Sequence, residues 1–181
     1  MNYRKLWASL VIVMAASFAV LIYYGNDLYH KMPPIPARVV SAEGPVIFTG
    51  EEIRDGQNVW QSAGGQQMGS VWGHGAYVAP DWSADWLHRE AVWLLDHWAR
   101  QQSGRPYHEL AAPEQASLRA RLQDEMRTNT YRPDSGELVV SADRAAAIRA
   151  VAEHYRKLFS PAPELADLRE AYAIPGNVLL D

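Results

Sequence analysis

The sequence of 181 residues contains no cysteine. It therefore has no disulfide and no C-x-x-C-H motif, the arrangement that attaches a c-type haem to a polypeptide. Redox groups that are held by cysteine thiolates, such as iron–sulfur clusters, are excluded as well. The absence does not identify a compartment, because oxidising compartments permit disulfides without requiring them.

Motifs for metal and phosphate binding are also absent. Neither H-E-x-x-H nor G-x-x-x-x-G-K-[ST] occurs in the sequence. His88 and His97 lie nine residues apart on one expected helix, and this spacing turns their side chains about 180° from each other. They therefore cannot hold one metal together. We interpret the histidines as solvated or hydrogen-bonded structural residues. The six histidines are His30, His74, His88, His97, His108 and His154.

Charge gives no sign of a nucleic-acid partner. The net charge is −4 and the isoelectric point is near 5.9, whereas nucleic-acid-binding domains are usually basic. No set of serine, histidine and acid can be assigned, and the pair Glu51 and Glu52 suits the first turn of a helix. These residues by themselves support no enzymatic mechanism, so whether the chain belongs to an enzyme stays open at this point.

One long apolar run is present near the N-terminus. Leu6 to Tyr24 is a 19-residue stretch without a charged side chain, long enough to cross a hydrocarbon core of about 30 Å as a helix. A cleaved signal peptide is the alternative, but no A-x-A-like site ends the run. We expect residues 1–30 to be a retained membrane anchor. Arg4 and Lys5 favour an N-terminus inside the cell and the rest of the chain outside, in the periplasm of a Gram-negative cell.

A linker is expected after the anchor. Residues 31–48 include Met32-Pro33-Pro34-Ile35-Pro36, which favours a stiff extended backbone. A folded domain is expected to begin at residue 49, because Thr49 and Glu52 form a T-x-x-E capping box at the start of a helix. This helix is expected to end near Ser62, before a pair of glycines.

Tryptophan and glycine are concentrated in one segment. Six of the seven tryptophans lie between Trp60 and Trp98, and several glycines interrupt residues 64–80. Tryptophan is unfavourable in water and glycine is costly to order, so this mixture predicts a tightly folded loop over residues 64–80. Core packing is the commoner role of such a cluster, and a ligand box is the alternative. We expect Trp60, Trp72 and Trp86 to pack the loop.

Apolar residues at helical spacing indicate further helices. The expected helices run from Asp81 or Ser83 to about Gln102, from Pro113 through Met126, from Ala142 to Phe159, and briefly over residues 165–172. The apolar stripe of the first of these helices consists of Leu87, Ala91, Leu94 and Trp98. A turn at Pro133-Asp134-Ser135-Gly136 indicates a small hairpin over residues 130–140. The expected fold class is mainly α, with a single N-terminal transmembrane helix followed by a helical domain over residues 49–173.

The run GQNVWQSAGGQQMGSVWGHGAYVAPDWSADWLHREA closely resembles the N-terminal part of bacterial quinol-dependent nitric oxide reductases. In that family, one polypeptide fuses two parts. The first is similar to the membrane-anchored cytochrome c subunit of two-subunit nitric oxide reductases, and the second is a haem-copper-oxidase-like catalytic part. The resemblance extends to about Tyr172. It implies a cytochrome c-like helical domain without haem, followed at residues 174–181 by a truncated connection to the catalytic part.

The resemblance also identifies where a haem would be attached. The related cytochrome subunits carry C-x-x-C-H, followed after a fixed spacing by G-x-G-A-Y-x-A-P-D. Here the second motif is Gly73-His74-Gly75-Ala76-Tyr77-Val78-Ala79-Pro80-Asp81. Counting back places Gly65, Met68 and Gly69 where the two thioether cysteines and the axial histidine stand. The resemblance therefore implies a cytochrome c-like domain that has lost its haem, with no cofactor-binding residue at these positions.

A calcium site is a further implication of the resemblance. In the two-subunit relatives, a glycine carbonyl and a tyrosine oxygen of the same motif help to bind calcium at the boundary with the catalytic subunit. The matching residues are Gly75 and Tyr77. Both offer the hard oxygen ligands that calcium prefers, but calcium needs six to eight ligands in all. These two residues would form only part of a calcium site.

The resemblance implies a structural role in a larger enzyme. The parent reduces two NO to N2O and water with electrons from quinol, and its haem b, haem b3 and non-haem iron lie in the catalytic part. This chain contains no catalytic residue of that reaction. Its expected partners are the catalytic part and the lipid bilayer of the bacterial inner membrane. The alternative is an independent membrane-anchored binding module with no redox role.

Overall fold

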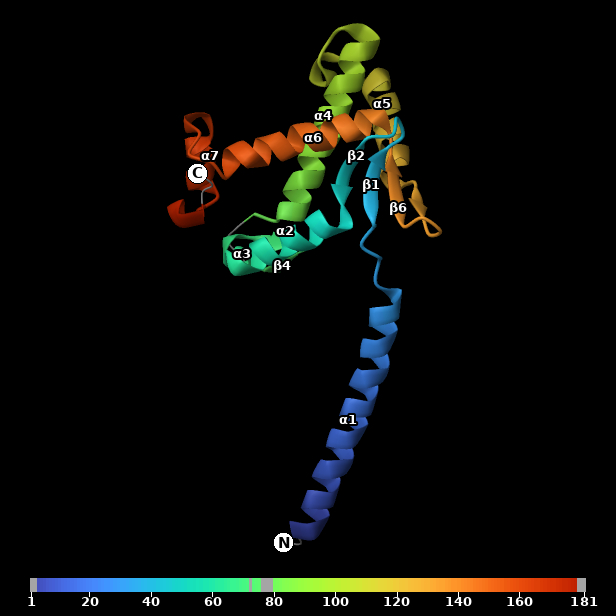
Figure 1. The fold of residues 1–181 in the computed structure, drawn as a ribbon, viewed down its shortest axis with the longest axis vertical. Helices are drawn as coiled ribbons and strands as arrows, with labels where there is room; N and C mark the ends of the chain where they lie inside the picture. Colours follow the sequence, from blue (N-terminus) through green and yellow to red (C-terminus); the bar gives the residue numbers. More distant parts are fainter. Residues whose placement is uncertain (1–2, 72, 76–79, 179–181) are drawn as a thin grey trace. The chain divides into compact units, whose positions relative to one another are not determined.

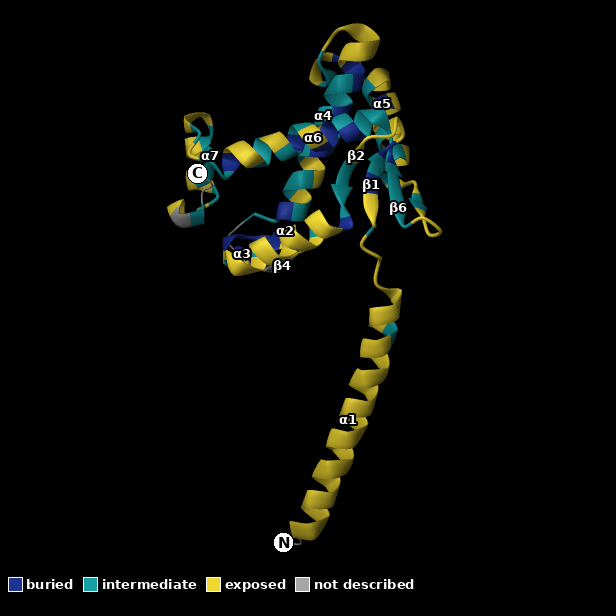
Figure 2. Ribbon diagram, viewed as in Figure 1, coloured by how far each residue is buried: buried dark blue, intermediate teal, exposed yellow. Residues whose placement is uncertain are grey.

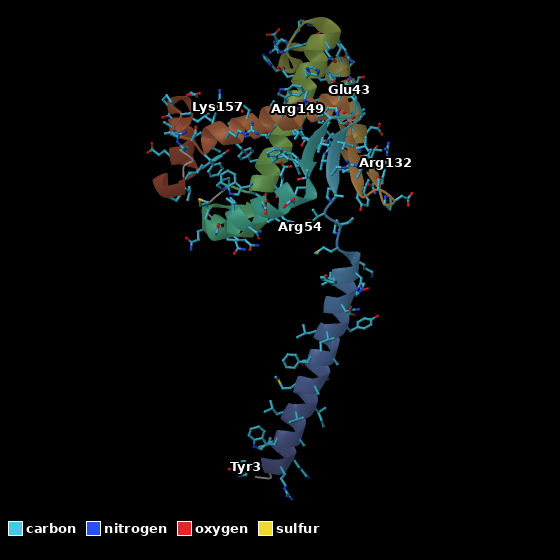
Figure 3. The ribbon with its side chains drawn as sticks, in the orientation of Figure 1. Tyr3, Glu43, Arg54, Arg132, Arg149 and Lys157 are labelled. Atoms are coloured by element: carbon cyan, nitrogen blue, oxygen red, sulfur yellow. The ribbon has the colours of Figure 1, made fainter. Side chains whose placement is uncertain are left out.

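The computed structural model describes residues 3–71, 73–75 and 80–178, and the chain divides into two units, Met1–Ile35 and Pro36–Asp181. The first unit contains α1 (Tyr3–Lys31), which is long and apolar enough to cross a membrane. Side chains extend from all around α1, and nearly all of them are exposed (Figures 2 and 3). The prediction of one N-terminal helix with the length and composition of a membrane span is confirmed.

The second unit contains a small four-stranded sheet with the order β2-β1-β6-β5. β1 pairs antiparallel with β2 and parallel with β6, and β5 and β6 form an antiparallel hairpin. A separate two-stranded ribbon consists of β3 and β4. The strands are β1 (Arg38–Ser41), β2 (Val46–Thr49), β3 (Ser70–Val71), β4 (His74–Gly75), β5 (Tyr131–Arg132) and β6 (Glu137–Val140).

Two of these strands lie where a linker was expected. Residues 31–48 contain β1 and most of β2, and the compact unit begins at Pro36 rather than at residue 49. β1 is a four-residue strand whose parallel partner, β6, follows almost 100 residues later in the sequence. A short strand with such a distant partner has no local signal that separates it from an extended linker. The hairpin expected over residues 130–140 is present as β5 and β6.

Helices make up most of the second unit, and α4 and α6 pack against each other at its centre (Figure 1). The α-helices are α2 (Gly50–Ser62), α3 (Gly65–Met68), α4 (Trp82–Ser103), α5 (Ala112–Arg127), α6 (Ala142–Leu158) and α7 (Ala166–Ala171). Short 3-10 helices are η1 (Tyr107–Glu109), η2 (Pro163–Leu165) and η3 (Gly176–Val178). The capping box is confirmed, because the Thr49 hydroxyl accepts from the Glu52 N–H while the Glu52 carboxylate accepts from the Thr49 N–H. The mainly α fold class is confirmed.

Two groups of buried side chains form the core. Leu94 and Trp98 of α4 are fully buried, as their helical spacing predicts, and they pack in one cluster with Leu118 of α5. The second group joins the sheet to α6 and consists of Val39, Val140, Ala145 and Ile148. Leu87 was expected on the buried stripe of α4 but is 39% exposed. Of the four stripe residues, Leu87 lies nearest the start of α4, in the part of the helix that α5 does not cover.

One ion pair is enclosed between the two central helices. Glu90 on α4 is only 2% exposed, and its carboxylate accepts a hydrogen bond of 2.7 Å from the Arg144 guanidinium on α6. The Trp86 indole N–H donates to the same carboxylate at 3.2 Å. A buried carboxylate is tolerated only when it is paired and hydrogen-bonded. Glu90 therefore fixes how α4 and α6 pack against each other.

Removing the partner of Glu90 is expected to destabilise the second unit strongly. Arg144→Met should lower the free energy of unfolding by about 3–5 kcal/mol, because it leaves a buried charge uncompensated. Urea unfolding of the detergent-solubilised chain, followed by tryptophan fluorescence, measures the change. Arg149→Met on the exposed part of the same helix is the control. The double variant Glu90→Leu with Arg144→Met should recover most of the loss. Equal effects of the two single arginine variants would contradict this account.

Candidate functional site

The chain reverses direction between α2 and α4, at the segment that the resemblance aligns with a haem-attachment motif. α2 ends at Ser62, and Gly64 adopts a left-handed conformation with φ of 71°, which glycine accommodates without strain. The single turn of α3 follows and brings Gly65 and Met68 into buried positions. Because β3 begins directly afterwards, the whole segment is held in a compact turn, as the glycine content predicts.

Indole rings occupy the space beside two of the three positions that the resemblance aligns with haem attachment. A β-carbon added to Gly65 would overlap the ring of Trp60, and one added to Gly69 would overlap the indole nitrogen of Trp82 and approach the Pro80 carbonyl oxygen. Protein interiors are packed nearly as densely as organic crystals, so such an overlap requires an indole or the backbone to move. Neither a cysteine nor a histidine fits at these positions in this arrangement. The residues present therefore do not fit a covalently attached haem.

Trp82 is the central ring of this aromatic cluster. It is 8% exposed and contacts four other rings from three different parts of the second unit. The centroid distances are 6.1 Å to Trp60, 6.1 Å to Tyr155, 5.7 Å to Phe159 and 5.6 Å to Tyr172. Such edge-to-face and tilted contacts add to the stabilisation from burial of each ring.

The expected packing of the loop by tryptophan is partly correct. Trp60 lies on the loop as predicted, and Trp72 falls outside the described residues. Trp86 instead stacks on Tyr155, with ring centroids 5.4 Å apart, and donates to Glu90. Trp82 packs against the loop where Trp86 was expected. The sequence contained a signal for this role of Trp82. Trp82 directly follows the helix cap Asp81, and a side chain in the first turn of α4 lies next to the end of the loop.

Asp81 ties the loop to the start of α4. Its carboxylate accepts hydrogen bonds from the Ala84 N–H at 2.9 Å, the Ser70 hydroxyl at 2.8 Å and the Gly73 N–H at 2.6 Å. These bonds lower the pKa of Asp81, with the Ala84 N–H contributing most. The carboxylate is therefore ionised at neutral pH, and its oxygens accept hydrogen bonds from groups of the protein itself. The sequence indicates Asp81 as the end of a motif and a helix start, but not as a residue that holds the loop.

The structure describes only half of the expected calcium pair. Gly75 belongs to β4 and pairs with Ser70 across the ribbon, while Tyr77 lies outside the described residues. Among the described residues, no group of three or more histidine, cysteine or acidic side chains is arranged to hold a metal ion. Partial calcium ligation by Gly75 and Tyr77 stays a prediction.

A second carboxylate, Asp85, joins three helices one turn further along α4. It accepts hydrogen bonds from Arg89 at 2.7 Å, from the Tyr155 hydroxyl at 2.7 Å and from the Tyr172 hydroxyl at 3.0 Å. Burial acts to raise the pKa of Asp85, but the hydrogen bonds from Arg89 and the two tyrosines outweigh it and leave the pKa lowered. Burial, and then the bond to Asp85, raise the pKa of Tyr155. Sequence reasoning missed this junction, because its members come from distant elements.

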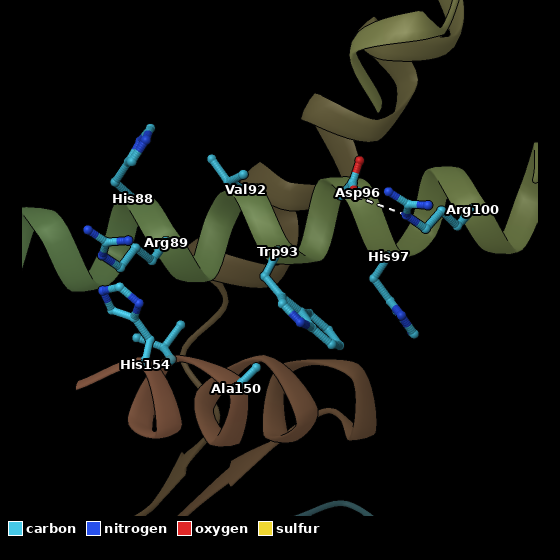
Figure 4. A pocket seen from close by; sticks show the side chains of 10 residues that line it. His88, Arg89, Val92, Trp93, Asp96, His97, Arg100, Ala150 and His154 are labelled. Atoms are coloured by element: carbon cyan, nitrogen blue, oxygen red, sulfur yellow. Dashed lines mark hydrogen bonds and ion pairs between the residues drawn. The ribbon is translucent and has the colours of Figure 1, made fainter. Parts of the chain in front are cut away.

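A shallow depression of about 510 Å³ along α4 contains three of the histidines (Figure 4). His88 and His97 extend to opposite sides of α4, as their nine-residue spacing predicts. His97 stacks on Trp93 with ring centroids 4.6 Å apart and lies 3.5 Å from Asp143. Burial, and then the charge of Arg89, lower the pKa of His154. The three imidazoles therefore do not converge on a common point.

The second unit is a mainly helical domain in which Trp60 and Trp82 lie against Gly65 and Gly69, two of the positions that the resemblance aligns with haem attachment. A family model described as the cytochrome c-like domain of NorB, a nitric oxide reductase component, matches residues 36–181, which is the whole second unit. The chain belongs to this family. Comparison with curated proteins gives no match.

The Asp85 junction is expected to make stability depend on pH. The folded-state pKa of Asp85 is lowered, so its contribution is complete well above the unfolded value of about 3.9 and is lost as the pH falls through the folded value. Asp85→Asn should lower the free energy of unfolding at pH 7 by about 1.5–3 kcal/mol. Urea titrations between pH 7 and pH 2 should show the difference from the unmodified chain shrinking below about pH 4.

The matched control for this prediction is Asp55→Asn on α2, since Asp55 is exposed. It should change the free energy of unfolding by less than about 0.5 kcal/mol at every pH. A difference for Asp85→Asn that stays constant down to pH 2 would show that the ionised carboxylate is not the group responsible.

Proposed function

We propose that the chain is the membrane anchor and haem-free periplasmic domain of a quinol-dependent nitric oxide reductase, in which it covers the outer face of the catalytic part. The parent reaction is 2 NO with quinol to N2O, water and quinone, so quinol supplies the two electrons and two protons. Family membership supports the association with nitric oxide reductase. The structural role is supported by the chemistry of the chain's own residues.

The observation that carries the proposal is the closure of the attachment segment by two indoles. Trp60 lies against Gly65 and Trp82 against Gly69, where a cytochrome would need side chains for its haem. A domain that relays electrons from a soluble donor needs a redox group at this place. Because this domain has a packed aromatic cluster there, it supports a parent that takes electrons from quinol in the membrane instead.

The membrane-anchoring part of the proposal is supported by α1. Its 29 residues exceed the roughly 20 needed to span a bilayer, and Arg4 and Lys5 precede the apolar run. The positive-inside rule then favours a periplasmic second unit on the outer side of the bacterial inner membrane. Within Leu6–Tyr24 there is no histidine or acidic residue to ligate a haem or relay a proton. Haem b, haem b3 and non-haem iron are therefore assigned to the catalytic part.

We expect the chain to acquire no covalent haem. Expression together with a c-type haem maturation system, followed by denaturation and a pyridine haemochrome spectrum, measures covalent attachment directly. The expected result is no Soret band that stays with the denatured polypeptide, because thioether formation needs cysteine. A c-type cytochrome expressed in the same cells provides the positive control. Covalent haem on this chain would overturn the haem-free assignment.

We also expect the chain to stabilise a catalytic part without turning over NO itself. When it is co-expressed with the catalytic part of a quinol-dependent nitric oxide reductase that lacks its own N-terminal domain, the two should co-purify. The melting temperature of the catalytic part should rise, since a partner that binds only the folded state stabilises it. An NO electrode with a quinol donor should record no consumption by the chain alone.

The same experiment distinguishes the alternative function. An independent membrane-anchored binding module would neither co-purify with the catalytic part nor change its melting temperature. The control chain carries Arg144→Met, because loosening the contact between α4 and α6 should weaken the stabilisation without touching α1. NO consumption by the purified chain alone would contradict a purely structural role.

A further inference from the structure

We infer that an apolar groove between α2 and α6 is the surface on which one helix of the catalytic part docks. This inference rests on the proposed function and names the surface through which the domain would act. The groove has a volume of about 420 Å³, and Phe48, Met68 and Trp86 contribute to its lining from other elements. Arg156 is the one charged side chain among the described residues that line it.

The two helices present matching stripes to the groove. Each contributes residues at positions i, i+3, i+4 and i+7, the spacing that gathers side chains on one helical face. The stripe on the α2 side consists of Gly56, Val59, Trp60 and Ala63. The stripe on the α6 side consists of Ala152, Tyr155, Arg156 and Phe159.

The sizes of these residues favour a helix as the occupant. Gly56, Ala63 and Ala152 are small, so another backbone can approach closely, while Trp60 and Tyr155 add large aromatic surfaces to the lining. A row of side chains on a third helix can pack between two such stripes, as in the ridges-into-grooves packing of helices. An amphipathic helix in an apolar groove is recognised through the same i, i+3, i+4 and i+7 anchors.

Exposure indicates that the groove is not covered by the rest of the domain. Val59 is 63% exposed, and the outer surface of α2 is almost entirely exposed (Figure 2). Burying an apolar side chain of this kind in a partner removes its apolar surface from water, which favours association. The groove therefore offers binding free energy that the described fold does not use.

The C-terminal end of the domain lies at the same groove. Val178 of η3 is one of the lining residues. In the proposed function the catalytic part belongs to the same enzyme as this domain, so a surface beside η3 is available for contact with it. We therefore assign the occupant as an apolar helix of the catalytic part, with an acidic residue facing Arg156. The guanidinium can exchange partners, because its ion pair with Glu153 at 3.1 Å is exposed and contributes little stability.

Because the chain has no cysteine, single cysteines allow a site-specific test in the assembled complex. Val59→Cys places a benzophenone-maleimide label in the groove. Val92→Cys on α4 is the matched control, since Val92 is 50% exposed and does not line the groove. After co-expression with the catalytic part and irradiation, the Val59→Cys label should cross-link to the catalytic part at least about tenfold more than the control label.

A charge in the groove provides an independent measurement. Val59→Asp should lower co-purification with the catalytic part by about tenfold or more, because an unpaired carboxylate would be buried in an apolar contact. Val92→Asp should leave co-purification within about twofold of the unmodified chain. Both variants should keep the unfolding transition of the unmodified chain, since both positions are exposed.

Each outcome separates this inference from the proposed function. If the unmodified chain co-purifies but the Val59→Cys label does not cross-link to the catalytic part, the groove inference is wrong while the proposed function stands. Cross-links from this label to a second copy of the chain, or to lipid, overturn the assigned occupant in the same way. If the unmodified chain does not co-purify at all, the proposed function fails and the inference fails with it.

Discussion

The packing of Trp82 against Gly69 is the contact on which the second unit depends most. The indole lies where a side chain at position 69 would have to stand, and it contacts rings from α2, α6 and the end of α7. A cytochrome c-like domain would place its cofactor beside this segment. Here one tryptophan joins these elements through its contacts with other aromatic rings.

Three carboxylates on or beside the first half of α4 add hydrogen bonds to that packing and link α4 to the elements around it. Asp81 holds the loop to the helix start, Asp85 joins α6 and the residue after α7, and Glu90 pairs with Arg144 inside the unit. Each is satisfied by several donors, which is the condition under which buried or half-buried charges are tolerated. These directional bonds add specific partners to the apolar contacts between the helices.

The proposed structural role is consistent with the way in which side chains of the second unit are paired. Several of its aromatic rings contact one another, and its half-buried carboxylate Asp85 is hydrogen-bonded within the fold, while the chain lacks cysteine. The described fold leaves one apolar surface uncovered at the groove between α2 and α6, where Val59 is exposed. Surfaces of that kind are typical of contacts with another polypeptide.

The sequence by itself determined the local features. The apolar run of α1, the capping box at Thr49 and the hairpin over residues 130–140 all depend on neighbours in the chain. Tertiary structure alone decided the pairing of β1 with β6 and the Asp85 junction. These contacts join residues that lie far apart in sequence, and periodicity or capping signals carry no information about partners at that distance.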